Sequence, residues 1–397
     1  MKLLVYRYNS ICEPYMIEGF RKLGIETDAV SREMTDKDML PSQRVKLVAE
    51  ALERIKPNAV FSINFFPSVA EVCRIYGIPY LAYTVDCPVL ELLSDQTGYD
   101  TSHIFMFDAS QAALVKSLGC KNAYHLPLAG DPSFASLPPL TGNKAPGKGV
   151  SFVGSLYNEK DPYAVIRDRL PGEVQGECDA LTIAQTGLRE AFFTEKVLSD
   201  GAVSSIREAS PQLFDDYGGS FKGADRFITA HCFLGFHMAA KERPELINFL
   251  SGYFETDIYT NSDTSVLQRN GNLRIHSGVK TLTEMPSVFR DSPINLNLTM
   301  LPIQTGLPQR IFDIAASGGF IMTDRREEME TCFEPGAEAE CFSSAEELLD
   351  KCSYYLSHDD ERKRIAKAGF ERLKKEHTWE HRASRIIMTV WGKRGSL

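Results

Sequence analysis

The chain has 397 residues, of which 43% are hydrophobic and 24% charged, a composition that excludes disordered, collagen-like and fibrous proteins. Its length is about twice that of a typical domain, so we expect two domains. The formal net charge of -9 weighs against a nucleic acid partner, and any phosphate site must therefore be local.

The N-terminal sequence, MKLLVYRYNS, carries only a short apolar run after one lysine, so we expect no secretory signal. No stretch approaches the ~20 consecutive apolar residues that span a bilayer. The nine cysteines are scattered and never spaced as C-x-x-C, which favours neither a disulfide framework nor a zinc ribbon. These patterns predict a cytoplasmic protein without a transmembrane segment.

Strand and helix patterns alternate along residues 1–140. The predicted strands are 2–8, 25–30, 59–63, 80–85, 104–107 and 123–128. S-x-x-E patterns at Ser10 and Ser68 predict the starts of two of the intervening helices, and a third at Ser344 does so near the C-terminus. Strands separated by such helices form a parallel sheet covered on both faces, so we assign 1–140 to an N-terminal Rossmann-like domain.

The segment SLPPLTGNKAPGKG, which begins at Ser136, has no periodicity and is typical of a linker. Residues 148–375 then predict a second Rossmann-like domain, interrupted at about 161–240 by a helical insertion. Its predicted strands are 149–153, 257–259, 273–276, 294–298 and 319–323. Residues 376–397 predict a last helix that packs back toward the N-terminal domain. The expected fold is thus α/β, with two doubly wound parallel-sheet domains facing across a ligand-binding cleft.

The most informative segment is INLNLTMLPIQTGLPQRIFDIAASGGFIMTD, residues 294–324. A strand is followed by a loop and by a helix with Pro308 in its first turn. Gln309 and Asp313 share one helix face, and Arg310 lies at the N-terminal turn. A helix N-terminus attracts anions, Arg310 adds a bidentate phosphate donor, and Asp313 can accept hydrogen bonds from sugar hydroxyls. The alternative is that Arg310 and Asp313 form an ordinary surface pair.

Polar residues also follow the strands of the N-terminal half. Asp86 ends one strand and can take a proton from a hydroxyl, or it can cap the next loop. Asn9 and Ser10, in the first strand-to-helix turn, and Asn64, after another strand, are further candidates for contacting an acceptor. Ser10 also fits the role of a helix N-cap.

The sequence favours no metal site. His377 and His381 have helical metal-ligand spacing, but a metal needs a third ligand, so we interpret them as packing residues. The basic cluster at residues 362–375 is mixed with acidic residues and is typical of a solvated helix face.

Several blocks resemble the CgeB-like, spore-maturation type group of glycosyltransferases. They are Q-R-I-F-D-I-A-A-S-G-G-F-I-M-T-D, F-E-P-G, H-D-D-E-R-K-R-I-A-K-A-G-F-E-R-L-K-K-E-H-T-W-E-H-R and, in the N-terminal half, F-S-I-N-F-F-P, G-I-P-Y-L-A-Y-T-V-D-C-P and H-L-P-L-A. The resemblance touches nearly the whole chain except the helical insertion. It implies the GT-B fold, a nucleotide-sugar donor held mainly by the C-terminal domain, and a reaction that needs no metal.

The resemblance also implies residue roles. Asp313 would grip the nucleotide ribose and Arg310 would face the diphosphate. Related enzymes often carry a glutamate where this chain has Thr305, so the contact to the transferred sugar stays unassigned.

The segment S-F-V-G-S-L-Y-N-E-K, residues 151–160, resembles the strand-loop opening of the donor domain in such enzymes. Gly154 would permit close backbone approach, and Lys160 would meet phosphate or be an ordinary solvated charge. Ser155 replaces the usual arginine, so phosphate neutralisation would depend more on Arg310 and Lys160.

We therefore predict metal- and cofactor-independent transfer of a sugar from a nucleotide-diphosphate sugar, with a UDP-sugar favoured, to an unidentified glycan, protein or small-molecule acceptor. Arg310 would stabilise the departing diphosphate. Asp86 would be the base if the reaction inverts the anomeric centre; inversion and retention both stay open. Alternatives are a GT-B-fold nucleotide-sugar epimerase or phosphorylase, and a non-catalytic scaffold of spore coat or surface-glycan assembly.

Overall fold

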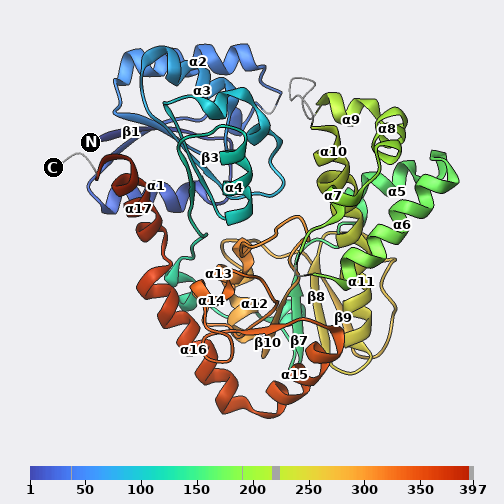
Figure 1. The fold of residues 1–397 in the computed structure, drawn as a ribbon. Coiled ribbons are helices and arrows are strands. Elements are labelled where there is room, and N and C mark those ends of the chain that lie inside the picture. The colour runs from blue at the N-terminus through green and yellow to red at the C-terminus, as the bar shows by residue number, and fades with distance from the viewer. Residues whose placement is uncertain (37, 190, 217–223, 393–397) are drawn as a thin grey trace. The chain divides into compact units, whose positions relative to one another are not determined.

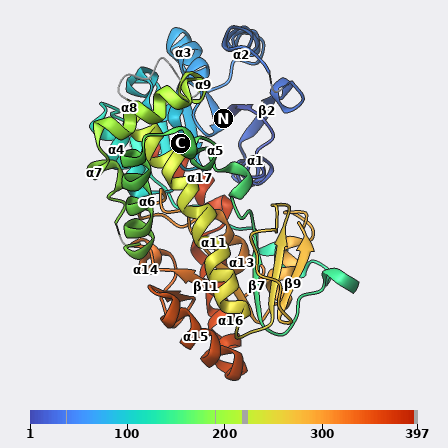
Figure 2. The same cartoon turned by 90° about the vertical axis from the view of Figure 1, so that its right-hand side faces the viewer.

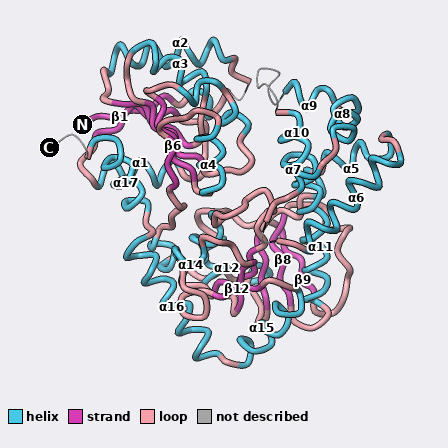
Figure 3. Tube along the Cα trace, in the orientation of Figure 1, coloured by secondary structure: helices cyan, strands magenta, loops and turns pink. Residues whose placement is uncertain are grey.

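The computed structural model describes residues 1–36, 38–189, 191–216 and 224–392. It divides into two compact units: unit 1 contains Met1–Ala129 and the C-terminal residues from Glu376 onward, and unit 2 contains Gly130–Lys375. Each unit is built on a six-stranded parallel sheet surrounded by helices (Figure 3). The predicted fold class, two Rossmann-like parallel-sheet domains, is confirmed.

The sheet of unit 1 has the strand order β2-β1-β3-β4-β5-β6. Its strands are β1 (Lys2–Tyr6), β2 (Glu26–Val30), β3 (Ala59–Ile63), β4 (Tyr80–Thr84), β5 (Ser102–Met106) and β6 (Ala123–His125). The helices between them are α1 (Glu13–Lys22), α2 (Pro41–Ile55), α3 (Pro67–Tyr76) and α4 (Ala109–Ser117). Every residue of β3 and β4 is buried, as expected of central parallel strands covered on both faces.

The C-terminal helix α17 (Trp379–Trp391) packs against α1 in unit 1 (Figure 1). Close approach depends on Gly19, because a side-chain carbon there would lie 2.9 Å from the carbonyl oxygen of Trp379. The Tyr15 ring stacks on Trp379 with centroids 5.9 Å apart, and Arg382 donates to the Leu128 carbonyl at 2.7 Å. Residues 393–397 of the predicted last helix lie outside the described residues.

The sheet of unit 2 has the order β12-β11-β10-β7-β8-β9. Its strands are β7 (Val150–Val153), β8 (Thr256–Thr260), β9 (Leu273–Ser277), β10 (Ile294–Asn297), β11 (Ile321–Asp324) and β12 (Glu340–Phe342). The helices after β9 are α12 (Met285–Asp291), α13 (Gln309–Ala316), α14 (Met329–Cys332), α15 (Ala345–Ser357) and α16 (Asp359–Glu376). The edge strand β12, only three residues long, was not predicted.

The described residues between β7 and β8 are helical or irregular, as the predicted insertion requires. The helices are α5 (Pro162–Ile166), α6 (Gly172–Gly187), α7 (Thr194–Val197), α8 (Asp200–Ala209), α9 (Pro211–Asp216), α10 (Asp225–Phe227), a π-helical segment (Ile228–Leu234) and α11 (Gly235–Ser251). Residues 190 and 217–223 of the predicted insertion lie outside the described residues. Figure 2 shows α11 as a long helix that runs from the insertion down beside the sheet of unit 2.

Two predicted helix caps are wrong. Helix α1 begins at Glu13, not after Ser10, and the Glu13 carboxylate instead accepts from the Tyr8 amide at 2.8 Å. Helix α3 begins at Pro67, so Ser68 lies inside its first turn. In both cases a proline in the first turn sets the start of the helix in place of a serine cap. Ser344 does cap α15 as predicted.

None of the helices that the structure describes has the length and apolar character needed to span a bilayer.

Candidate functional site

The predicted donor-site residues converge at the carboxyl ends of β7 and β10. These strands are parallel neighbours, with Phe152 paired to Leu296, so the loops that follow them lie side by side. The loop after β7 contains Gly154, and α13 begins after the loop that follows β10. A side-chain carbon at Gly154 would lie 2.9 Å from Nη2 of Arg310. Arg310 therefore lies close to the backbone at Gly154, and the role of Gly154 toward a donor stays a prediction.

Arg310 lies in the first turn of α13 and is only partly exposed. Its Nε atom is buried and has no hydrogen-bond partner, and burial lowers the pKa of the guanidinium. Among the described residues, no carboxylate oxygen lies within 4.0 Å of this guanidinium. The alternative of an ordinary surface pair with Asp313 is therefore wrong. Among the described residues, Arg310 is therefore a partly buried cation without a carboxylate at ion-pair distance, although the Asp313 charge still acts on it.

Asp313 is 6% exposed, and Nε2 of Gln309 donates to its Oδ1 at 2.8 Å. Gln309 and Asp313 thus share a helix face, as predicted. Burial raises the pKa of Asp313 to about 7, although Gln309 and the Arg310 charge act in the opposite direction. Asp313 is thus a carboxyl group that is largely removed from solvent.

Pro308 is the N-cap of the helix that carries these residues, and Gln309 is its first helical residue. The small residues 315–319, which end α13 and follow it, permit close packing. A side-chain carbon at Gly319 would lie 2.5 Å from the Phe289 carbonyl oxygen.

Ser155 and Lys160 do not reach Arg310 through any described contact. The Ser155 hydroxyl donates to Glu159 at 2.8 Å and lies 3.2 Å from the Ser262 hydroxyl. Lys160 is exposed, and its Nζ lies 5.5 Å from the centroid of the Tyr157 ring. Both interpretations of Lys160, as a phosphate contact and as a solvated charge, remain open.

Sequence reasoning missed Arg243, a residue of α11 that contacts the loop after β7. Its side chain is buried, at 5% residue exposure; Nη1 donates to the Ser155 carbonyl at 2.7 Å and Nη2 to the Leu298 carbonyl at 2.8 Å. The guanidinium carbon lies 4.5 Å from the Tyr157 ring centroid. No sequence signal pointed to it, because Arg243 lies 88 residues beyond Ser155 at the end of an insertion without a motif.

Unit 1 gathers the predicted acceptor-side residues at the carboxyl edge of its own sheet. Asn64 Nδ2 donates to Asp86 at 2.6 Å and to the Tyr8 hydroxyl at 2.8 Å, while its Oδ1 accepts from the Val85 amide at 3.0 Å. Asp86 is exposed, so Asn64 orients a carboxylate that solvent can reach. The cluster can therefore present an oriented base.

Tyr8 is the member of this cluster that the sequence did not reveal. Its pKa is raised, first by burial and then by the Asp86 charge, and it is hydrogen-bonded to Ser10. Asn9, between them, is exposed and has a left-handed φ of 77°, a conformation that asparagine tolerates. The predicted residues Asn9 and Ser10 thus adjoin the Asn64 and Asp86 pair through Tyr8.

The two C-terminal histidines have separate partners. His377 Nδ1 lies 2.6 Å from Arg382, and His381 Nδ1 lies 2.7 Å from the Thr378 hydroxyl. Among the described residues, no group of three or more His, Cys, Asp or Glu side chains is arranged to hold a metal ion.

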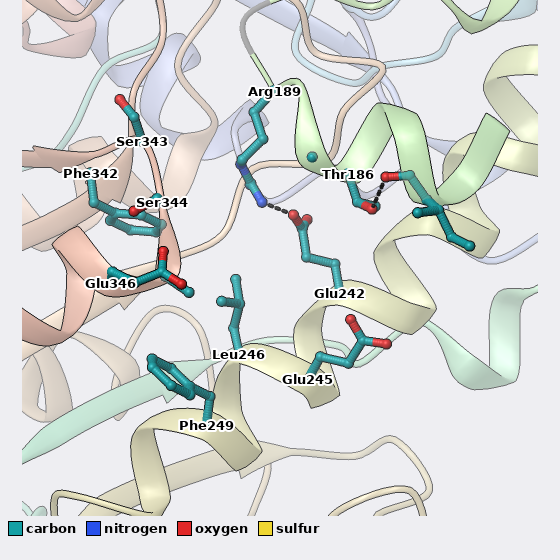
Figure 4. A pocket seen from close by; sticks show the side chains of 13 residues that line it. Thr186, Arg189, Glu242, Glu245, Leu246, Phe249, Phe342, Ser343, Ser344 and Glu346 are labelled. Carbon is teal, nitrogen blue, oxygen red and sulfur yellow. Dashed lines mark hydrogen bonds and ion pairs between the residues drawn. The ribbon is translucent and has the colours of Figure 1, made fainter. Parts of the chain in front are cut away.

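Unit 2 also has a cavity of about 500 Å³ between α6, α11 and the start of α15 (Figure 4). Arg189 and Glu242 point toward one another across it and form an ion pair. Leu246, Phe249 and Phe342 supply apolar lining. None of the predicted donor-site residues lines this cavity.

Comparison with protein-family models gives a match to part of the chain. A family model described as glycosyl transferase-like matches residues 239–388, a range that includes Arg243, Arg310 and Asp313. The comparison with curated proteins gave no match.

Solved structures share the fold of the whole chain at low identity. HepE from Anabaena, solved with UDP and glucose, is 9% identical with a TM-score of 0.52, covering 99% of this chain and 100% of that one. A glycosyltransferase from Rickettsia africae is 10% identical (TM-score 0.53, 98% of both chains). Sucrose-phosphate synthase from Thermosynechococcus elongatus is 8% identical (TM-score 0.51, 99% and 98%). The chain thus shares the GT-B fold of these structures, and its residues 239–388 match the glycosyl transferase-like family model.

Proposed function

We propose that the chain transfers a sugar from a nucleotide-diphosphate sugar, most favourably a UDP-sugar, to a hydroxyl-bearing acceptor. The observation that carries the proposal is Arg310, a partly buried guanidinium beside Gly154 with an unpartnered Nε and no described carboxylate oxygen within 4.0 Å. A desolvated cation is costly unless an anion accompanies it. The diphosphate of a nucleotide sugar would supply that anion at the N-terminal turn of a helix, where free amides also favour it.

The remaining donor-site roles follow from where each side chain lies. Asp313, one helical turn deeper and oriented by Gln309, is suited to accept hydrogen bonds from ribose hydroxyls. Because Gly154 has no side chain, nothing at this position crowds the Arg310 guanidinium. Lys160 is exposed and can approach a phosphate from solvent. Ser155 contributes its backbone, since its carbonyl is held by Arg243. UDP and UDP-glucose complexes of HepE from Anabaena support a UDP-sugar as donor.

The chemical step is departure of the diphosphate from an oxocarbenium-like carbon. Arg310 and the α13 amides would stabilise the charge that develops on the leaving oxygen. In an inverting reaction Asp86 would deprotonate the acceptor hydroxyl, with Asn64 fixing the orientation of its carboxylate. Tyr8, Asn9 and Ser10 would contact the acceptor. The sequence blocks quoted above support a finer placement in the CgeB-like group.

The proposal is tested by calorimetric titration with UDP, GDP, ADP and dTDP. We expect one of these to bind wild-type protein, and Arg310→Gln to weaken that binding by well over roughly tenfold with little change in Tm. Absence of binding by every nucleoside diphosphate would overturn the proposal and favour a scaffold. Equal losses of affinity and Tm would make Arg310 a structural residue.

A second assay separates transfer from the related reactions. UDP release from UDP-glucose is measured with and without a panel of sugar acceptors. Acceptor-dependent release is expected for a transferase. Interconversion of the donor without an acceptor would instead indicate an epimerase, and orthophosphate-dependent cleavage of a glycosidic bond would indicate a phosphorylase.

A further inference from the structure

Arg243 has an arrangement that packing alone does not explain. It reaches from α11 to two backbone carbonyls, those of Ser155 in the loop after β7 and Leu298 just beyond β10. These are the two loops that carry Gly154 and lead to Arg310. One side chain therefore ties together the two segments between which the anion would lie.

Arg243 forms no ion pair with a described carboxylate, although the more distant Asp324 charge acts favourably on it. Both of its described hydrogen-bond partners are neutral carbonyls, and no described carboxylate oxygen lies within 4.0 Å of it. The pKa of Arg243 is lowered to about 10, first by burial and then by the neighbouring Arg310 charge, with Tyr157 and Asp324 acting in the opposite direction. Two guanidinium groups thus repel one another in a partly desolvated region. A dianionic ligand would relieve that repulsion.

The loop after β7 covers the Arg243 guanidinium, so a ligand cannot contact it from that side. The Tyr157 ring covers the guanidinium at 4.5 Å and packs against Phe236 with ring centroids 5.7 Å apart. Tyr157 itself has a left-handed φ of 70°, so the loop turns back sharply at this point. Arg243 is consequently placed behind the loop, where its charge acts on a ligand without touching it.

We propose that Arg243 is a positioning residue of the donor site, which fixes the loop after β7 and supplies a second positive charge to the diphosphate that Arg310 binds. This inference rests on the proposed function. It also explains how the site tolerates Ser155 in place of a cation: the missing charge comes from the insertion helix α11. The insertion thereby becomes part of the donor site.

The test compares charge-retaining and charge-removing variants. Affinities for UDP and for uridine are measured by calorimetry for wild type, Arg243→Lys and Arg243→Met. We expect Arg243→Met to weaken UDP binding about tenfold or more, which corresponds to about 1.4 kcal/mol, and to leave uridine binding nearly unchanged. Arg243→Lys keeps the charge and should lose less than about threefold, because an ammonium can still reach one carbonyl.

Arg362→Met is the matched control. Arg362 lies in the same unit, is 7% exposed and donates to the Tyr355 carbonyl at 2.6 Å, but it belongs to α16. Its loss should lower Tm without changing UDP affinity.

Three outcomes would overturn the inference: UDP affinity unchanged in Arg243→Met, equal losses for UDP and uridine, or equal losses in the Lys and Met variants. If wild-type protein binds neither UDP nor another nucleoside diphosphate, the proposed function fails first. A double variant with Arg310→Gln gives an independent check, since two charges acting on one anion should show non-additive losses.

Discussion

Asp313 provides the sharpest test of the donor site, because its ionisation links stability to ligand binding. Burial raises the pKa of this carboxyl to about 7, whereas an aspartate in an unfolded chain titrates near ~3.9. Between these values the unfolded chain is ionised and the folded chain keeps its proton. The stabilising contribution is therefore fully present below pH ~4 and is lost as pH rises through about 7.

The perturbation is Asp313→Asn, which removes the titration but keeps an oxygen to accept from Gln309. A difference of about 3 pKa units at about 1.4 kcal/mol each sets an upper bound of about 4 kcal/mol. Only about two of those three units lie between pH 5 and pH 8, so we expect the free energy of unfolding of wild type to fall by up to about 3 kcal/mol relative to the variant over this range. Urea unfolding of both proteins across this range measures the difference.

Asp359→Asn is the control for the stability measurement. Asp359 is exposed, and hydrogen bonding to Lys363 lowers its pKa, so it is ionised throughout this range. The stability difference between that variant and wild type should not change from pH 5 to pH 8. A similarly flat difference for Asp313→Asn would refute the reasoning about burial of the carboxyl.

Ligand binding adds a second readout. If ribose hydroxyls donate to Asp313, the bound nucleotide favours the ionised carboxylate, and UDP binding near pH 6.5 should release a proton from wild type. Calorimetry in two buffers with different ionisation enthalpies measures that proton. Asp313→Asn should release correspondingly less. Equal proton release by both proteins would show that Asp313 does not contact the ribose.

Three further predictions follow from the geometry. Gly154→Ala should reduce UDP affinity by more than roughly tenfold, since the new carbon meets an arginine nitrogen at 2.9 Å; Gly176→Ala, in an open helical position, is the calorimetric control and should bind normally. In an inverting enzyme Asp86→Asn should lower kcat by about 10² or more with little change in KM; unchanged steady-state kinetics would remove Asp86 as the base. Gly19→Ala should cost about 2 kcal/mol by forcing α17 from α1, seen as faster hydrogen exchange in α17; unaltered exchange would contradict the packing argument.

The sequence predicts the architecture well because hydrophobic periodicity reports directly on burial. The centres of eleven strands and the helical character of the insertion are visible as patterns. The edge strand Glu340–Phe342 is too short to produce one. The helix starts predicted at Ser10 and Ser68 are wrong because prolines in the first turns, Pro14 and Pro67, define those starts more strongly than the serines do.

The candidate site is only partly predictable for a different reason. Gln309, Arg310 and Asp313 lie within one short segment, so helical spacing alone places them together. Arg243 comes from a helix distant in sequence, and the contact it makes is to backbone carbonyls, which are the same for every residue type. Tyr8 is similar, because its partner Asn64 is 56 residues away. Such contacts depend on the order of strands, which no local pattern specifies.

The contrast within unit 2 strengthens the ligand argument. Elsewhere in this unit a buried arginine is neutralised by the chain itself: Arg189 forms an ion pair with Glu242, and its Nη2 lies 3.5 Å from Asp324. The fold can thus place carboxylates directly beside a buried arginine. Arg243, by contrast, donates only to backbone carbonyls. Among the described residues, no carboxylate oxygen lies within 4.0 Å of Arg243 or of Arg310. Two neighbouring arginines without an ion-pair partner lower the stability of the fold, so stability does not account for their presence. A bound diphosphate would provide the missing negative charge.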